Sequence, residues 1–363
     1  MKRRLPWPGV GGDGNVRQQE PPDAQANLYG MMNPPRIGFI GCGRHATANL
    51  YPAIRLAGGQ IVAVCARHLE RAQATAALFG VPRAYDRVAD LVGSDLDAVF
   101  VSTPEAEQAA VVADVVRMRR HVFVEKPLGL NAREAATIAD LAAEVGVFVM
   151  VGFMKRFAPA YQEIRRAAQD TAFGERLALY GMFAIGSRQG WEDAWYLQTG
   201  AIHYVDLCRY LFGEVVDVSG MRNSRRTQLI QFITLRFEGG RIGTLFFAGV
   251  PAWGRHYEEL TLTGVNGFVR AENMVRIISH IDRPTSPPRP RWQTLDEEDR
   301  VLTSVHTASS GGSQALYLNG YVGEVQHFLD CLRTHNPPQP SAADNVQTMT
   351  LCDRILRALD VRA

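Results

Sequence analysis

Between residues 36 and 151 the chain alternates short apolar runs with longer segments that are apolar on one face only. The apolar runs are 36–40, 61–65, 98–101, 121–124 and 148–151. The segments between them repeat their apolar residues at helical spacing over about 69–79, 106–118 and 132–145, and another helix is expected to reach about residue 57 with a bend at Pro52. Buried strands that alternate with amphipathic helices predict a parallel sheet covered by helices on both faces.

After Gly152 the pattern changes to longer segments in which apolar and polar residues alternate. These segments are 177–184, 227–237, 241–247, 259–263 and 268–278. Gly239-Gly240 and Asn266-Gly267 between them are typical of hairpins, so we predict an open, mostly antiparallel sheet. Helices are expected near 159–169, 203–211, 321–334 and 343–359, and a long Pro- and Ser-rich loop over about 283–314.

The two patterns predict two domains and a tail. Residues 1–33 are rich in glycine and proline and carry few apolar residues, which predicts a disordered tail. No apolar stretch follows Lys2-Arg3-Arg4, so this end does not resemble a signal peptide. We expect the α/β domain to span 34–153 and an α+β domain for substrate binding and oligomerisation to span 154–363.

Composition narrows the class of protein. The 363 residues carry a net charge of +2, which argues against nucleic acid as a partner, and no apolar run is long enough to span a membrane. Five widely spaced cysteines without a CxxC pair favour the cytoplasm and give no metal site. Only three of the thirty-nine basic residues are lysine, which makes Lys126 and Lys155 candidates for work that arginine cannot do.

A glycine-rich turn follows the first predicted strand and opens a helix. It comprises Gly41, Gly43, Arg44 and, in the place of a third glycine, Ala46. Such a turn lets the backbone approach a pyrophosphate at the helix N-terminus, so it predicts a Rossmann dinucleotide-binding domain. The second strand ends in Ala66-Arg67 rather than in an acid, which favours NADP over NAD, with Arg44 as a second phosphate contact.

Five segments in this order resemble the Gfo/Idh/MocA oxidoreductase family. They are 41–46, Ser102-Thr103-Pro104, Glu125-Lys126-Pro127, 152–157 and 200–206. The resemblance covers the chain from about Arg36 to its C-terminus. Independently of it, Lys126 follows a buried parallel strand, at the edge of the sheet where ligands bind in such folds, and Pro127 restricts the direction of the preceding residue.

The resemblance implies a role for several residues. Thr103, Pro104 and Glu125 would contact the cofactor, Lys126 would also bind the reacting oxygen, and His203 would be the general acid/base. Three positions depart from the family pattern, and one of them is Ala201, which stands two residues before His203 where the family usually has glycine. Thr199 stands where the family has an acid, four residues before His203, and would orient His203 or the substrate; Gln108 stands where relatives commonly have histidine.

Further residues are candidates for substrate binding. Lys155 and Arg156 either reach substrate oxygens between the domains or only flank the domain connection. Trp191 and Tyr196 belong to a segment that mixes aromatic residues with carboxylates, which is typical of sugar sites, although the same aromatics would also suit packing on the second sheet.

These observations together lead to one hypothesis and two alternatives. The hypothesis is an NADP- or NAD-dependent oxidoreductase that transfers hydride between nicotinamide and a secondary alcohol or carbonyl of a sugar, cyclitol or related polyol. By resemblance, we expect a homo-oligomer, either a dimer or a tetramer. The alternatives from the same family are a catalytically silent dinucleotide-binding regulator and an NAD-dependent glycoside hydrolase.

Overall fold

The computed structural model describes residues 33–186, 192–224, 228–254, 256–282, 299–304 and 313–359. The predicted tail over 1–33 therefore lies almost entirely outside the described residues, as do Trp191 and most of the predicted loop over 283–314. Within the described residues, no helix has the length and apolar character needed to cross a membrane. All five cysteines are free.

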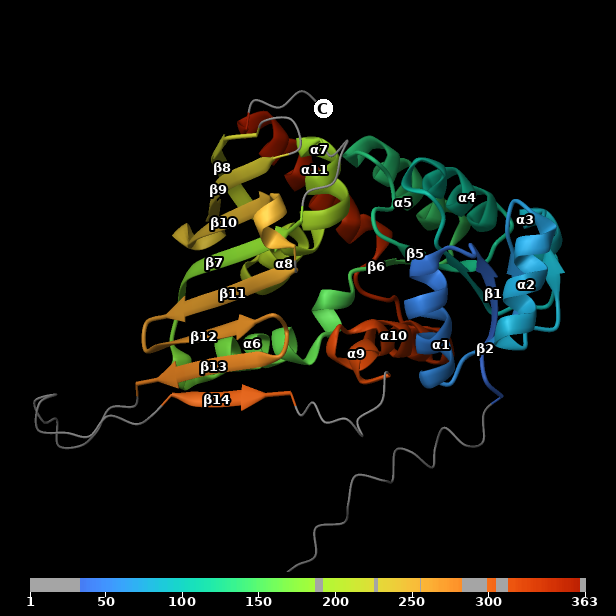
Figure 1. Ribbon diagram of the computed structural model, residues 1–363, viewed down its shortest axis with the longest axis horizontal. Coiled ribbons are helices and arrows are strands. Elements are labelled where there is room, and N and C mark those ends of the chain that lie inside the picture. Colours follow the sequence, from blue (N-terminus) through green and yellow to red (C-terminus); the bar gives the residue numbers. More distant parts are fainter. Residues whose placement is uncertain are drawn as a thin grey trace, which may run out of the picture. The chain divides into compact units, whose positions relative to one another are not determined.

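The first sheet has six parallel strands in the order β3-β2-β1-β4-β5-β6 (Figure 1). They are β1 (Arg36–Ile40), β2 (Gln60–Cys65), β3 (Ala84–Tyr85), β4 (Ala98–Val101), β5 (His121–Glu125) and β6 (Val149–Gly152). The helices of this half are α1 (Tyr51–Leu56), α2 (Leu69–Phe79), α3 (Val88–Val92), α4 (Glu105–Arg117) and α5 (Ala132–Val145). This strand order is that of the Rossmann fold, which confirms the predicted fold class.

Both faces of this sheet are buried, which explains why its strands are continuously apolar. On one face Phe39, Phe100 and Phe123 form a row of rings, and Phe328 packs edge-on against the last two. On the other face valines such as Val101 and Val124 lie in the core that also contains residues of α4 and α5.

The second sheet has eight strands in the order β14-β13-β12-β11-β7-β10-β9-β8. They are β7 (Arg176–Ile185), β8 (Val215–Arg222), β9 (Leu229–Phe237), β10 (Ile242–Gly249), β11 (Tyr257–Gly264), β12 (Gly267–Glu272), β13 (Arg276–Ile281) and β14 (Arg300–Thr303). All neighbours are antiparallel except β7 and β10. The predicted open, mostly antiparallel sheet is therefore confirmed.

The remaining helices connect this sheet to the Rossmann half. They are α6 (Pro159–Gln169), α7 (Asp193–Trp195), α8 (Ile202–Phe212), α9 (Gln314–Leu318), α10 (Tyr321–Thr334) and α11 (Ala342–Ala358). Helix α10 contacts α1, and α11 contacts both α5 and β8. Just before α11 the chain runs beside β6, where the amide of Val151 donates to the carbonyl of Pro340 (3.0 Å). The C-terminal helices thus pack on both sheets.

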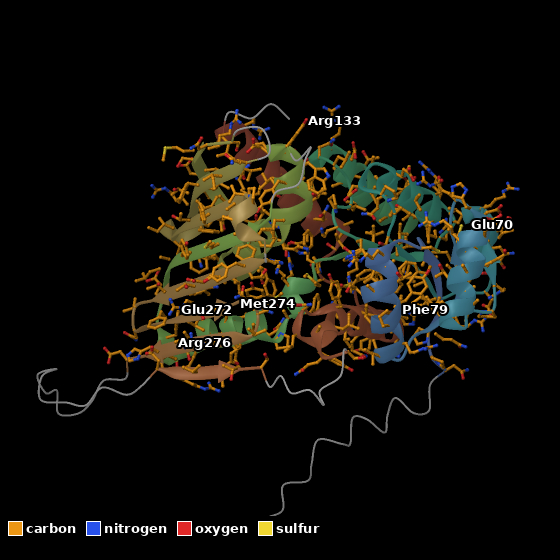
Figure 2. All side chains as sticks on the ribbon, viewed as in Figure 1. Glu70, Phe79, Arg133, Glu272, Met274 and Arg276 are labelled. Atoms are coloured by element: carbon orange, nitrogen blue, oxygen red, sulfur yellow. The ribbon has the colours of Figure 1, made fainter. Side chains whose placement is uncertain are left out.

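Two local expectations were wrong. The segment 268–278 is a hairpin, not one strand: β12 and β13 turn at Asn273 and Met274, both at positive φ (Figure 2). Residues 300–303 form the edge strand β14 inside the predicted loop. Pro52 lies within helical backbone that is continuous over residues 44–56, directly after a π-helical turn, η3 (Ala46–Leu50), so its missing N–H falls next to the irregular part of this helix.

Candidate active site

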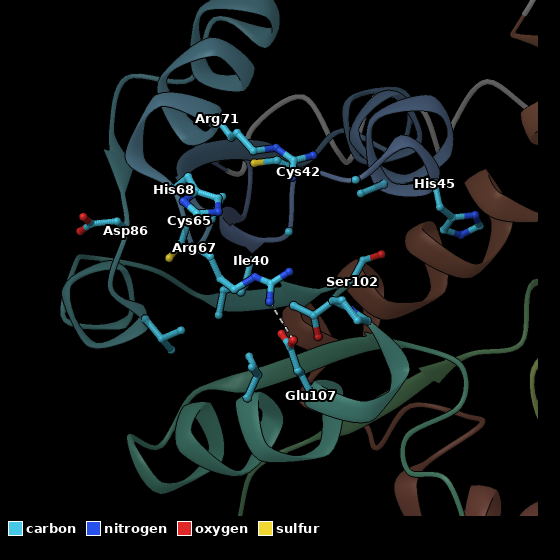
Figure 3. Close-up of a pocket in the computed structure, with 18 of the residues that line it drawn as sticks. Ile40, Cys42, His45, Cys65, Arg67, His68, Arg71, Asp86, Ser102 and Glu107 are labelled. Carbon is cyan, nitrogen blue, oxygen red and sulfur yellow. Dashed lines mark hydrogen bonds and ion pairs between the residues drawn. The ribbon is translucent and has the colours of Figure 1, made fainter.

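A cavity of about 430 Å³ lies at the carboxyl ends of β1, β2 and β4 (Figure 3). The turn after β1 forms one wall. Gly41 has φ +122° and a Cβ there would lie 2.0 Å from the carbonyl oxygen of Ser102, so only glycine fits. A Cβ at Gly43 would instead meet nothing within 4 Å. Ala46 is fully buried against the sheet.

The other walls carry polar and basic groups. Thr103 and Pro104 come from the loop after β4, and the Thr103 hydroxyl oxygen is buried without a hydrogen-bond partner. The end of β2 contributes Ala66 and Arg67, and Arg67 is paired with Glu107 of α4 at 2.9 Å. Further basic side chains lining the cavity are Arg44, His68 and Arg71. The open turn at Gly43, the unpartnered hydroxyl of Thr103 and the basic side chains together suit the binding of a dinucleotide and its phosphates.

Glu125 at the end of β5 links this cavity to Lys126. One carboxylate oxygen of Glu125 lies 2.9 Å from His45 Nε2, and Asn49 donates to the other ring nitrogen of His45 (3.2 Å). Burial alone would lower the pKa of His45, but the hydrogen bond and charge of Glu125 raise it. His45 was not predicted as a site residue; its only signal in the sequence is its place within the glycine-rich turn.

Gln108 of α4 holds two loops of the site together. Its side-chain NH2 donates to the carbonyls of Glu125 (2.5 Å) and Pro127 (2.7 Å), and its amide oxygen accepts from the N–H of Thr103 (3.3 Å). Gln108 is almost completely buried. The side chain therefore positions both the segment that carries Lys126 and the loop that lines the cavity.

Lys126 reaches across to the second half of the chain. Its Nζ donates to the backbone carbonyl of Thr199 at 2.6 Å, and the peptide bond to Pro127 is cis. Thr199 lies in a π-helical turn, η6 (Tyr196–Ala201), which leads into α8. The Thr199 hydroxyl donates to the carbonyl of Trp195 (2.6 Å), so in this structure it bonds its own helix rather than His203. Burial lowers the pKa of Lys126.

His203, in the first turn of α8, is 8% exposed. Its Nδ1 has no hydrogen-bond partner among the described residues, and its ring packs edge-on against Phe153. Burial, and then the positive charges of Lys126 and Lys155, hold the pKa of His203 well below its usual value. The imidazole is therefore neutral near pH 7 and able to accept a proton.

Lys155 is buried in a polar network of the second half. Its Nζ donates to Glu258 of β11, which also accepts from Tyr161 (2.7 Å) and lies 3.0 Å from His256. Burial alone would raise the pKa of Glu258, but Lys155 and His256 overcome it and lower the pKa to about 2. The Met274 sulfur lies 3.6 Å from Lys155 Nζ. The positive charge of Lys155 is thus already balanced by Glu258 within the protein.

Arg156 also has protein partners. It donates two hydrogen bonds to Asp206 (2.6 and 2.7 Å) and a third to Asp344 of α11 (2.6 Å). Asp206 faces α11 from α8, so this cluster ties the two helices to the start of the second half. In this structure Arg156 and Asp206 serve the packing of these elements.

The aromatic segment before η6 is only partly described. Trp191 lies outside the described residues. Tyr196 is fully buried, and its hydroxyl donates to the carbonyls of Phe183 (3.2 Å) and Ala248 (3.1 Å). The Tyr196 ring therefore belongs to the core of the second sheet. Within the described residues, no three histidine, cysteine or acidic side chains are grouped to hold a metal ion.

Two family models match the two halves of the chain. The family model described as "Oxidoreductase family, NAD-binding Rossmann fold" matches residues 35–153, and the "GFO/IDH/MocA C-terminal domain" matches residues 161–270. D-apiose dehydrogenase of Paraburkholderia graminis is 25% identical over 87% of this chain and 85% of its own. Inositol 2-dehydrogenase of Rubrobacter xylanophilus is 26% identical over 89% of both chains.

Solved structures share the fold. A dehydrogenase from Chromobacterium violaceum superposes with a TM-score of 0.80 at 23% identity, covering 91% of this chain and 96% of its own. Levoglucosan dehydrogenase in complex with NADH and L-sorbose has a TM-score of 0.77 at 18% identity, covering 91% and 97%.

The fold, the cavity and the Lys126 segment define a nicotinamide-dinucleotide-dependent oxidoreductase that acts on CH–OH groups. More particularly, the chain belongs to the Gfo/Idh/MocA family, as its motifs had suggested.

Proposed function

We propose that the protein interconverts a secondary alcohol and the corresponding carbonyl of a sugar, cyclitol or related polyol. The observation that carries this proposal is the contact between Lys126 Nζ and the Thr199 carbonyl. It brings the end of β5 to the turn before His203, beside the dinucleotide cavity. The relatives named for D-apiose and inositol support a polyol substrate.

Each residue of this site has a chemical role. When bound, the nicotinamide supplies a hydride acceptor or donor. His203 is neutral at pH 7 and accepts the hydroxyl proton in oxidation, and it returns this proton in reduction. Lys126 donates a hydrogen bond to the reacting oxygen and stabilises its negative charge as the proton leaves. Thr199 holds Lys126 through its carbonyl, and Gln108 and Glu125 position the Lys126 backbone.

The test is turnover of a panel of polyols and ketosugars with NAD(H) and NADP(H). We expect net consumption of the cofactor. Lys126→Ala should lower kcat by at least a hundredfold with little change in cofactor affinity, and Lys126→Arg should not restore it, because arginine is bulkier and its pKa is not lowered. Cofactor binding without turnover on the whole panel would favour a regulator, and glycoside cleavage without net cofactor change would favour a hydrolase.

We further propose that NADP is the preferred cofactor. The end of β2 carries no acid for the adenosine ribose, and Arg67, His68, Arg71 and Arg44 line this part of the cavity. A 2′-phosphate would compete with Glu107 for Arg67. Some relatives use NAD, such as the scyllo-inositol 2-dehydrogenase (NAD(+)) of Bacillus subtilis, so this preference would be a feature of this chain.

Binding of NADPH and NADH to variants of this wall tests the cofactor preference. Ala66→Asp with Arg67→Ser should move the preference toward NADH by tenfold or more. The matched variant Glu107→Gln frees Arg67 and should strengthen NADPH binding alone. Equal responses of both cofactors in the two variants would refute the role of Arg67.

We also propose that the protein is a cytoplasmic homo-oligomer, either a dimer or a tetramer. Five free thiols support a reducing compartment. The face of the second sheet opposite its helices supports self-association, because Tyr180, Phe232 and Ile242 are 40–51% exposed there. The division into domains at residues 153 and 154, and the tail over 1–33, remain predictions.

A further inference from the structure

Three carboxylates around the Lys126 and His203 site are already paired with cations of the protein. Glu125 lies 2.9 Å from His45, Glu258 binds Lys155 and His256, and Asp206 holds Arg156. None of these three acids is free to balance another positive charge. A fourth acid, Glu324, is buried near Glu125 without a hydrogen-bond partner, and burial and the charge of Glu125 raise its pKa well above the usual value, which favours its neutral form.

Lys126 differs from His45, Lys155 and Arg156 in its partner. Within the described residues the one hydrogen bond of its Nζ goes to a neutral group, the Thr199 carbonyl, and no carboxylate oxygen lies within 4.0 Å. Glu125 and Glu105 act on it only from a longer distance. An ammonium has three N–H groups, so two of them remain for a ligand.

Thr199 and His203, the neighbours of Lys126 in the second half of the chain, supply no negative charge for its ammonium. The side chain of Thr199 is neutral, and its hydroxyl is used by the Trp195 carbonyl. His203 lies one helical turn further along the chain and has no described hydrogen-bond partner at Nδ1. A half-buried ammonium without a counter-ion is costly to the protein, and a bound anion removes this cost.

We propose that the substrate carries a carboxylate next to the reacting carbinol, so that it is a sugar acid or a similar polyhydroxy acid. One remaining N–H of Lys126 serves the reacting oxygen and the other serves the carboxylate. A single ammonium balances the charge of a monoanion, whereas it would leave one charge of a phosphate dianion unbalanced. Arg156, a nearby candidate, is committed to Asp206 and Asp344. This inference rests on the proposed function.

The experiment uses matched pairs that differ only in a terminal CH2OH or carboxylate: threitol and threonate, xylitol and xylonate, glucitol and gluconate. Binding to the NADPH-loaded protein is measured by calorimetry, and turnover is measured separately with the oxidised cofactor. In at least one pair we expect the acid to bind ten times more tightly or better. This preference should weaken as salt is added, because the charge of Lys126 is screened.

Two variants test whether the preference for the acid over the alditol arises at Lys126. Thr199→Asp places a carboxylate beside Lys126 and should abolish or reverse the preference, while the neutral analogue Thr199→Asn should keep it. If Thr199→Asp does not fold, Lys126→Met is the second variant, in which the acid and the alditol should bind equally.

The outcomes separate this inference from the proposed function. Alditols that bind as well as the acids, or an acid preference that survives Lys126→Met, would overturn the inference whether or not turnover occurs. Acid binding that depends on Lys126 but leads to no turnover with either cofactor would support the inference about the ligand. The same result would overturn the proposed function.

Discussion

Gln108 illustrates how a neutral side chain can organise a site of charged residues. Its amide offers two donors and one acceptor, and all three are used: by the carbonyls of Glu125 and Pro127 and by the N–H of Thr103. A neutral histidine has only one donor, so the glutamine is suited to holding both carbonyls at once. These three hydrogen bonds explain how the fold accommodates glutamine at a position where relatives commonly have histidine.

We therefore expect Gln108→Glu to lower kcat for the best substrate about 10–100-fold, since two buried carbonyls lose their donors and the Lys126 segment is no longer held in place. Cofactor affinity should change less, because the acceptor for Thr103 remains. Steady-state kinetics and cofactor titration measure the two effects. A fall in Tm with unchanged kcat would mean that Gln108 only stabilises the fold.

The Lys155 and Glu258 pair makes a pH-dependent contribution to stability. The pKa of Glu258 is lowered to about 2 in the folded protein, from an ordinary value of 4.5. Its contribution is therefore complete above about pH 4.5 and is lost as the pH falls toward 2, by about 3 kcal/mol in total. Urea unfolding at pH 6 and pH 3 measures the loss, which should be smaller in Lys155→Met/Glu258→Gln.

The single variant Glu258→Gln provides a second measurement on the same pair. It leaves the Lys155 ammonium buried without a counter-ion and should cost about 3–5 kcal/mol at pH 7. The double variant should cost clearly less, because it removes both charges. Equal costs for the single and the double variant would show that the two residues are not coupled.

At the scale of elements, the turn from β1 to η3 contains two glycines, Gly41 and Gly43, that differ in what a side chain would meet there. Gly41 is needed for the backbone itself, since its φ is positive and a side chain would meet Ser102, whereas a side chain at Gly43 would project into open space. We therefore expect Gly41 to serve the fold and Gly43 to serve the cofactor.

This difference predicts that Gly43→Ala keeps the Tm of the wild type but weakens cofactor binding at least tenfold. Gly41→Ala should lower both the Tm and the affinity. Thermal unfolding without cofactor and a cofactor titration are sufficient to compare them. A wild-type affinity in Gly43→Ala would mean that the pyrophosphate does not approach this turn.

The elements that were predicted correctly from the sequence are long amphipathic helices and strands whose side chains are buried on both faces of the sheet. Strands β1, β4 and β5 are continuously apolar because both faces of their sheet are covered, and α5 and α10 match their predicted bounds. Strand β3 has two residues, too few for a pattern, and the β12–β13 hairpin turns without glycine. Edge strands β8 and β14 are largely exposed and have weak patterns.

Site residues were predictable to the extent that they lie in motifs. The glycine-rich turn and Lys126 were found through the order of elements, and the structure brings Lys126 to the turn before His203. The partners of Lys155 and Arg156 were not predictable, because Glu258 and Asp344 are about 100 and 190 residues further along the chain. Contacts of this kind depend on the packing of the two sheets and leave no local pattern.

At the scale of the whole molecule, the exposed face of the second sheet carries a row of apolar side chains on its central strands. Phe232 and Phe246 are paired across β9 and β10 with ring centroids 4.7 Å apart, and Met182 of β7 continues the row. Such a row is costly in water and is stabilised when a second copy covers it.

We expect Phe232→Asp to shift the protein from an oligomer toward the monomer. The matched control is Leu78→Asp, which changes an equally apolar side chain, 74% exposed on α2, away from this sheet. Light scattering coupled to size exclusion measures the mass of each. An oligomer that persists in Phe232→Asp, or is lost in both variants, would place the interface elsewhere.

The scarcity of lysine has a practical consequence. Of the three lysines, Lys155 is buried against Glu258 and Lys126 is half-buried at the site. Reductive methylation with 13C-formaldehyde would therefore yield a magnetic resonance spectrum with very few signals, and the Lys126 signal would report directly on that amine. Its chemical shift, followed across a pH titration, would give the ionisation state of Lys126 inside the intact protein, before and after each candidate ligand is added.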